Sequence, residues 1–202
     1  MTSTGILEKN AINPSIERWA AGLIGDLAPA NALTIGLTNG SCRANDRRSV
    51  DELARTLHAA LSERFDSIQP MLVLRLQHNF GDDIGPAANA VEVDAEPSII
   101  DSNLGGWSEV TVPVPAGNLS SRTLEHVPHW ISTWKGKFGV ILVDLGPMGE
   151  APSRMMGRLC DGCYILLGPG KCGSRDWILR HVAWHQHSGS TICGTLVISH
   201  AT

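Results

Sequence analysis

The chain has 202 residues, of which 43% are apolar and 18% charged, and a formal net charge of -4 at pH 7. This length and composition predict one globular domain with a sizeable core. The net negative charge favours neither nucleic acid nor anionic lipid as a partner, and no apolar run approaches the roughly 20 residues of a membrane span. The odd number of cysteines, 5, favours reduced thiols over a disulfide framework. The sequence also does not open with a basic and then apolar leader peptide, and a cytoplasmic protein is therefore expected.

The first half of the chain predicts a helix followed by a strand, a helix and a second strand. Apolar residues at helical spacing indicate an N-terminal amphipathic helix over about 13–28. Residues 33–37 are typical of a short buried strand. The next helix would begin near Ser49, whose hydroxyl would form a capping box with Glu52. The apolar run 71–76 then predicts a strand that is covered on both faces of its sheet.

The second half continues the alternation of strands and helices. Residues 78–108 are rich in Gly, Asp, Pro and Asn and predict an irregular insert. A short strand is expected over 110–114, and Pro113 favours an edge position for it. The remaining expected elements are a helix over 121–134, strands over 138–144, 161–167 and 195–199, and a helix over 174–187. Alternation of this kind predicts a single α/β domain over 1–202, a three-layer αβα sandwich around a mostly parallel sheet.

The turn between the first strand and the following helix is laid out like a nucleotide-binding P-loop but lacks the residues that hold phosphate. A working loop uses glycines for close backbone approach, a lysine for the phosphate charge and a Ser or Thr hydroxyl for magnesium. When the strand is aligned at Thr38, Asp46 falls at the lysine position. Arg47 and Arg48 fall at the hydroxyl positions, and Arg43 and Asn45 at two glycine positions, so that Gly40 remains as a loop glycine. This degenerate Walker A loop places a carboxylate against a triphosphate, a repulsion of roughly 4 kcal/mol per pair of unit charges at 4 Å.

The order of motifs from Gly139 to His200 resembles a known family. A strand ends in Asp144, which opens an Asp-x-x-Pro motif. After it come, in this order, a helix, Asp161-Gly162, a strand, Pro-Gly-Lys, a helix and a Gly-Thr-Leu-Val strand. This order is similar to that of the bacterial tyrosine kinases of capsule and exopolysaccharide export, in the MinD/ParA branch of P-loop ATPases. The resemblance implies a P-loop NTPase-like fold.

The resemblance also implies roles for two residues outside the loop. Asp144 matches the carboxylate that helps to hold magnesium, whereas Arg75 stands at the position of the second metal-side carboxylate. Because phosphoryl transfer depends on positioning and electrostatics, the losses at Asp46, Arg47 and Arg75 predict a pseudoenzyme with no catalytic residue and no cofactor. The alternative is an ATP-binding kinase or ATPase in which Asp144 alone recruits magnesium and Arg47 or Arg48 replaces the lysine.

A pseudo-ATPase or pseudokinase of this kind would act as an interaction module in exopolysaccharide biosynthesis. The expected partner of the module is a membrane-embedded chain-length regulator or a true kinase, and this partner would hold the module at the inner membrane. The module would also be able to form homo-oligomers. A further alternative is a partner of a partitioning or division ATPase. Tyr164 is the only tyrosine, so the family's tyrosine-rich tail is missing.

Three other patterns have a chemical and a structural interpretation. Cys160 and Cys163 have the spacing of zinc ligands, but free buried thiols are favoured over a metal site. His181 and His185 share a helix face, which favours a solvated surface. Trp177 and Trp184 stand seven residues apart on one predicted helix, and core packing is favoured over a partner surface.

Overall fold

A computed structural model describes residues 14–26, 32–40, 47–64, 70–78, 96–102, 106–114, 122–168 and 173–198. Its strands are β1 (Leu33–Asn39), β2 (Met71–His78), β3 (Ile100–Asp101), β4 (Ser108–Val114), β5 (Val140–Pro147), β6 (Gly162–Leu167) and β7 (Ile192–Val197). Its helices are α1 (Pro14–Asp26), α2 (Arg47–Arg64), α3 (Arg122–Lys135), α4 (Ala151–Gly157) and α5 (Arg175–His187).

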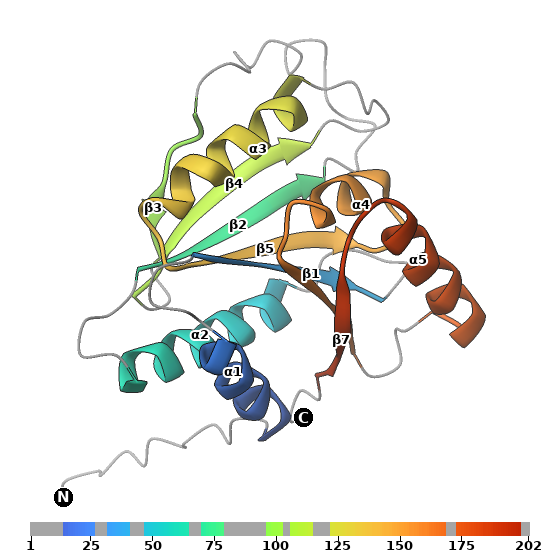
Figure 1. The fold of residues 1–202 in the computed structure, drawn as a ribbon, viewed down its shortest axis with the longest axis horizontal. Helices are drawn as coiled ribbons and strands as arrows, with labels where there is room; N and C mark the ends of the chain where they lie inside the picture. The colour runs from blue at the N-terminus through green and yellow to red at the C-terminus, as the bar shows by residue number, and fades with distance from the viewer. Residues whose placement is uncertain are drawn as a thin grey trace, which may run out of the picture.

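The described strands form one sheet in the order β3-β4-β2-β5-β1-β6-β7. All neighbours are parallel except β3 and β4, which are antiparallel. Parallel neighbours require crossover connections, and helices supply them on both faces of the sheet (Figure 1). Leu37 and Arg75 both lie in register with Asp144, so the ends of β1, β2 and β5 meet at one edge of the sheet.

Two apolar layers hold the helices against the sheet. One layer joins α1 and α2 to the face that carries Leu37 and Leu142, and the other joins α3 and α4 to the face that carries Leu74 and Val143. Trp134 of α3 is fully buried in the second layer. The three-layer αβα architecture and the mostly parallel sheet predicted from the alternating pattern are therefore confirmed.

The expectation that residues 110–114 form an edge strand is wrong, because β4 lies between β3 and β2. Pro113 is nevertheless tolerated. It is paired with Gln77 of β2 on one side, while β3 pairs only with Ser108 and Glu109 at the other end of β4. No described strand pairs with the outer side of β4 at Pro113, so the missing N–H of proline breaks no ladder there.

The start of α2 also differs from the prediction. The helix begins at Arg47, so Ser49 is its third residue and is buried. Ser49 is therefore not the N-cap that the capping-box interpretation assigned to it.

The predicted irregular insert, 78–108, is described only in part, since residues 79–95 and 103–105 lie outside the described residues. β2 extends through His78, and the described part contains β3, which the sequence did not predict. Trp107 packs into the core layer below α1 and α2. None of the helices in the described residues has the length and apolar character needed to span a bilayer.

Candidate functional site

The C-terminal part of β5 is held by buried polar contacts. Asp144 is buried and its Oδ1 accepts a hydrogen bond from the backbone N–H of Gly146 at 3.1 Å. Gly146 has φ 70°, a left-handed conformation that favours glycine. Thr38, at the end of β1, donates its hydroxyl proton to the carbonyl of Gly146 at 3.0 Å and lies 3.1 Å from the Ser153 hydroxyl of α4. The expected magnesium carboxylate, Asp144, therefore lies within β5, where it is paired with β1 and β2 and its side chain is bound to the backbone.

Gly40 follows β1 directly and passes close to β6. Its N–H donates to the Leu166 carbonyl at 2.9 Å, and its carbonyl accepts from the Gly173 N–H at 3.0 Å. A Cβ at Gly40 would lie 2.5 Å from Cδ2 of Leu167, so a larger residue at this position would displace that side chain.

The other expected loop residues are described only in part. Arg43, Asn45 and Asp46 lie outside the described residues. Arg47 begins α2, and the side chain of Arg48 is exposed in the first turn of that helix. The two arginines at the expected hydroxyl positions are thus placed at a helix N-terminus.

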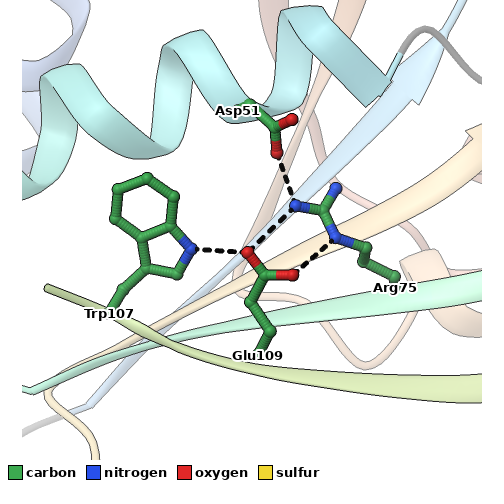
Figure 2. A network of polar contacts seen from close by, with 4 residues as sticks. All are labelled: Asp51, Arg75, Trp107 and Glu109. Carbon is green, nitrogen blue, oxygen red and sulfur yellow. Dashed lines mark hydrogen bonds and ion pairs between the residues drawn. The ribbon is translucent and has the colours of Figure 1, made fainter. Parts of the chain in front are cut away.

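Arg75 of β2 forms the main polar network beside this site. Its Nη2 donates to Oδ1 of Asp51, in the second turn of α2, at 2.5 Å. Its Nε donates to Oε2 of Glu109 on β4 at 3.3 Å. Figure 2 shows the guanidinium between the two carboxylates, with the indole of Trp107 donating to Glu109 at 3.0 Å. Arg75 therefore joins α2, β2 and β4.

Burial and pairing set the charges of this network. The Arg75 side chain is only 8% exposed, against 21% for Asp51 and 19% for Glu109. Burial alone would raise the pKa of Glu109, but hydrogen bonds from Arg75, Ser102 and Trp107 outweigh it and lower that pKa. Burial opposes the charge of Arg75 as well, and its bonds to Glu109 and Asp51 outweigh the burial and raise the pKa of the guanidinium. Glu109 and Arg75 are therefore both held in their charged forms.

This arrangement has a direct chemical consequence. A guanidinium has five N–H donors and no lone pair to offer, so it cannot ligate a metal ion. The two carboxylates nearest to it, Asp51 and Glu109, already accept its hydrogen bonds. The position that the resemblance assigns to a second metal-side carboxylate therefore carries a paired cation.

A cluster of His and Trp side chains on α5 lies next to the turn after β5, and the sequence did not predict it. His185 is fully buried, and its Nε2 lies 3.1 Å from the Met148 carbonyl. Because a carbonyl only accepts, Nε2 is the protonated nitrogen, and Nδ1 is left buried without a hydrogen-bond partner. Burial lowers the pKa of His185. The neutral imidazole is therefore the native form.

His181 is also buried, so the expectation of a solvated histidine face is wrong. Its ring lies 4.0 Å from that of Trp177 and 4.7 Å from that of Trp184. Trp184 is 46% exposed, so the two tryptophans do not form a core pair as expected. The Arg154 guanidinium lies 5.5 Å from the ring centroid of Trp184. The signal that could have located the cluster is the alternation of Trp and His along one helix.

Cys160 and Cys163 are both buried in the core layer of α3 and α4. Their thiols lie 3.6 Å from the Met156 carbonyl and 3.4 Å from the Gly157 carbonyl. Within the described residues, no group of three or more His, Cys, Asp or Glu side chains could hold a metal ion. The zinc alternative thus has no third ligand in the described part of the chain.

The comparisons with known proteins identify the fold. No protein-family model matches the sequence, and no curated protein matches it. Among solved structures, the kinase domain of the Escherichia coli tyrosine kinase ETK matches with a TM-score of 0.65 at 13% identity, over 93% of this chain and 75% of that chain. The VpsO kinase domain matches with a TM-score of 0.59 at 13% identity, over 93% of this chain and 94% of that chain. MinD, a cell division protein of Aquifex aeolicus, matches with a TM-score of 0.54 at 15% identity, over 83% of this chain and 69% of that chain.

The chain shares the P-loop NTPase-like αβα fold of these kinase domains and of MinD. Its solved neighbours include bacterial tyrosine kinase domains, so the resemblance indicated by the motif order is confirmed at the level of the fold. In this P-loop NTPase fold, Gly40, Arg75 and Asp144 stand at or near the ends of β1, β2 and β5, on the side of the sheet where α2 begins.

Proposed function

We propose that this chain is a non-catalytic, P-loop-derived interaction module, a pseudo-ATPase or pseudokinase. The observation that carries the proposal is the pairing of Arg75 with Asp51 and Glu109, at the position where the resemblance expects a metal-side carboxylate. Phosphoryl transfer relies on a metal ion and positioned charges, and a guanidinium at this position offers that metal ion no lone pair. The replacement of the loop lysine by Asp46 supports the same conclusion.

The fixed contacts of Arg75 also support a single conformational state. In nucleotide-driven proteins, a ligand shifts the balance between states only when it binds one of them more tightly. Here an internal cation already joins α2 to β2 and β4. The module would then present one constant surface to its partner.

The proposed partner class rests on the resemblance of the motif order to the kinases of polysaccharide export. Several of the fold neighbours are described as tyrosine kinase domains. We infer that the module works in exopolysaccharide biosynthesis or export, where it binds a membrane-embedded chain-length regulator or an active kinase at the cytoplasmic face of the inner membrane.

Calorimetric titration with ATP and magnesium tests the absence of catalysis directly. We expect no binding heat up to millimolar nucleotide and no hydrolysis. The Asp144→Ala variant is the matched comparison, because it removes the one expected metal ligand that remains. Binding that requires magnesium and weakens in Asp144→Ala would refute the proposal.

That result would instead support the second candidate, an ATP-binding kinase or ATPase with an atypical loop. The observation in its favour is the buried Asp144 of β5, at a position where the resemblance expects a magnesium ligand. Arg47 or Arg48 at the start of α2 would then supply the positive charge that the lysine provides elsewhere. Replacement of each arginine by glutamine would weaken binding in this case.

A further inference from the structure

Cys160 and Cys163 form a pair of thiols that the proposed function does not use. Cys160 follows α4, and Cys163 is the second residue of β6. Both are buried, and both contact the same point of β1. A Cβ on Gly36 would lie 2.8 Å from the Sγ of Cys163 and 3.1 Å from the Sγ of Cys160. The two sulfur atoms are therefore close neighbours in the fold.

The main chain between the two cysteines is fixed against β1. The Asp161 N–H donates to the Thr34 carbonyl at 2.8 Å, and the Thr34 N–H donates to Oδ2 of Asp161 at 2.7 Å. Cys163 itself is in register with Gly36. Because these contacts hold the chain at and between the two cysteines, the sulfur atoms stay together in the native state.

The two thiols differ in how easily they lose a proton. When Cys163 is ionised, the S–H of Cys160 can donate to its sulfur. This hydrogen bond lowers the pKa of Cys163 although burial opposes the effect, whereas the same hydrogen bond and burial raise the pKa of Cys160. Because the thiolate is the nucleophilic form of cysteine, Cys163 is the attacking sulfur of the pair and Cys160 is the resolving one.

The fold can also accommodate the pair without its protons. The S–H groups of Cys160 and Cys163 donate to the carbonyls of Met156 and Gly157. Both carbonyls accept a backbone N–H as well, from Leu159 at 2.9 Å and from Cys160 at 3.2 Å. Loss of the two S–H groups therefore leaves neither buried carbonyl without a partner.

We propose that Cys160 and Cys163 are a modification site, at which hydrogen peroxide forms a reversible disulfide bond within the chain. The Cys163 thiolate attacks one peroxide oxygen and the O–O bond breaks. Cys163 becomes a sulfenic acid, and the other oxygen leaves as hydroxide, which takes up the proton that Cys163 had lost. The sulfur of Cys160 then attacks the sulfenic sulfur, and the S–S bond forms as the S–O bond breaks. The proton of Cys160 leaves with this oxygen as water, so two thiols are oxidised and one peroxide is reduced to two waters.

The burial of the pair favours a small oxidant. Cys163 is 0% exposed and Cys160 is 8% exposed, so a bulky disulfide such as oxidised glutathione has no room to approach either sulfur. Hydrogen peroxide is little larger than water and would reach the pair from the Cys160 side. The resulting bond would tie the end of α4 to β6, next to the strand that leads into the degenerate loop. No nucleotide takes part, so the test is independent of whether the chain binds ATP.

Peptide mapping of the folded, full-length chain tests the proposal. The protein is treated with hydrogen peroxide until the exposed Cys193 is oxidised, and it is then unfolded, alkylated and digested with trypsin. The tryptic peptide 159–171 contains Cys160 and Cys163 and no other cysteine. We expect this peptide to lose the mass of two hydrogen atoms and to take no alkyl group. When dithiothreitol is added before alkylation, the peptide should take two alkyl groups.

Three variants separate the pair from the other cysteines. Cys160→Ser and Cys163→Ser keep a hydrogen-bond donor at each position and are expected to abolish the loss of two hydrogen atoms. Cys193→Ser is the matched control, because it removes a cysteine of another tryptic peptide, 181–202, and should leave the disulfide intact. Circular dichroism verifies that all three variants are folded.

Two results for the wild type would overturn the proposal. The first is a peptide 159–171 that still takes two alkyl groups once Cys193 is oxidised. The second is a peptide 159–171 that gains oxygen atoms, or is joined to another peptide, instead of losing two hydrogen atoms.

Discussion

Replacement of Arg75 by methionine is the most direct test of the network that joins α2, β2 and β4. Methionine keeps much of the volume of the arginine stem but removes the charge and all donors. The change leaves Asp51 and Glu109 without their shared partner. Loss of one partner from a buried ion pair costs about 3–5 kcal/mol, because the other charge stays buried and unpaired.

The exposure of the carboxylates sets the value within this range. The side chains of Asp51 and Glu109 are 21% and 19% exposed, so water can partly solvate them once the guanidinium is gone. The expected loss is therefore at the lower end, about 3 kcal/mol in the free energy of unfolding. For a chain of this length, such a loss lowers the melting temperature by roughly 6–12 °C.

Urea unfolding of wild type and variant measures this loss, and an exposed ion pair provides the control. Lys135 lies 3.2 Å from Asp161, and their side chains are 34% and 45% exposed. Lys135→Met should cost less than about 1 kcal/mol, because exposed pairs contribute little. Arg75→Lys should fall between the two, at about 1–2 kcal/mol, since an ammonium cannot reproduce the fork that reaches both carboxylates.

The reasoning is refuted if Arg75→Met costs no more than Lys135→Met. In that case Arg75 would be a solvated surface charge, and its position would carry no argument against a metal ion.

Three further predictions concern other parts of the core. The lowered pKa of His185 means that the unfolded chain binds protons more readily than the folded one. The contribution of His185 to folding stability is therefore fully present above about pH 6.5 and is lost as the pH falls below it. In urea unfolding, His185→Asn should flatten this pH dependence, whereas His187→Asn should not. Gly36→Ala would place a Cβ 2.8 Å from the thiol of Cys163 and should cost about 1–3 kcal/mol by overpacking in the same assay. Removal of metal with EDTA should leave the melting temperature unchanged, because the thiols of Cys160 and Cys163 lie in the core; a large fall would revive the zinc alternative.

The strands that carry the site could be predicted because their sequences are continuous apolar runs. β5 is buried along its whole length, and its run ends at the Asp144 carboxylate that the motif order singled out. β7 was less accurately placed, at 195–199 instead of Ile192–Val197. Its start is set by pairing with Cys163 of β6, and pairing between distant segments leaves no local trace in the sequence.

The partners of Arg75 could not be predicted for the same reason. The sequence indicated that an arginine replaces a carboxylate, but Asp51 and Glu109 lie 24 and 34 residues away along the chain. They meet only because α2 packs over β2 and because β4 is the neighbour of β2. Neither relation can be obtained from spacing alone.

The burial of His181 and His185 had a different cause. Helical spacing correctly placed both residues on one face of a helix, but it could not decide which face is covered. The exposed face of α5 carries Leu179, and the covered face carries the two imidazoles. A hydrophobic pattern would have assigned the leucine to the covered face and the histidines to solvent. A backbone carbonyl at Met148, which has no signature in the sequence, is the acceptor for His185.

The peptide groups around Met148 have one more consequence. The Met148 amide donates to Asn39 at the end of β1, and its carbonyl accepts from His185 of α5. Peptide units are planar and resist twisting. Each of the two hydrogen bonds is made by one planar peptide unit next to Met148, so α5, through the side chain of His185, helps to hold the end of β1 in place.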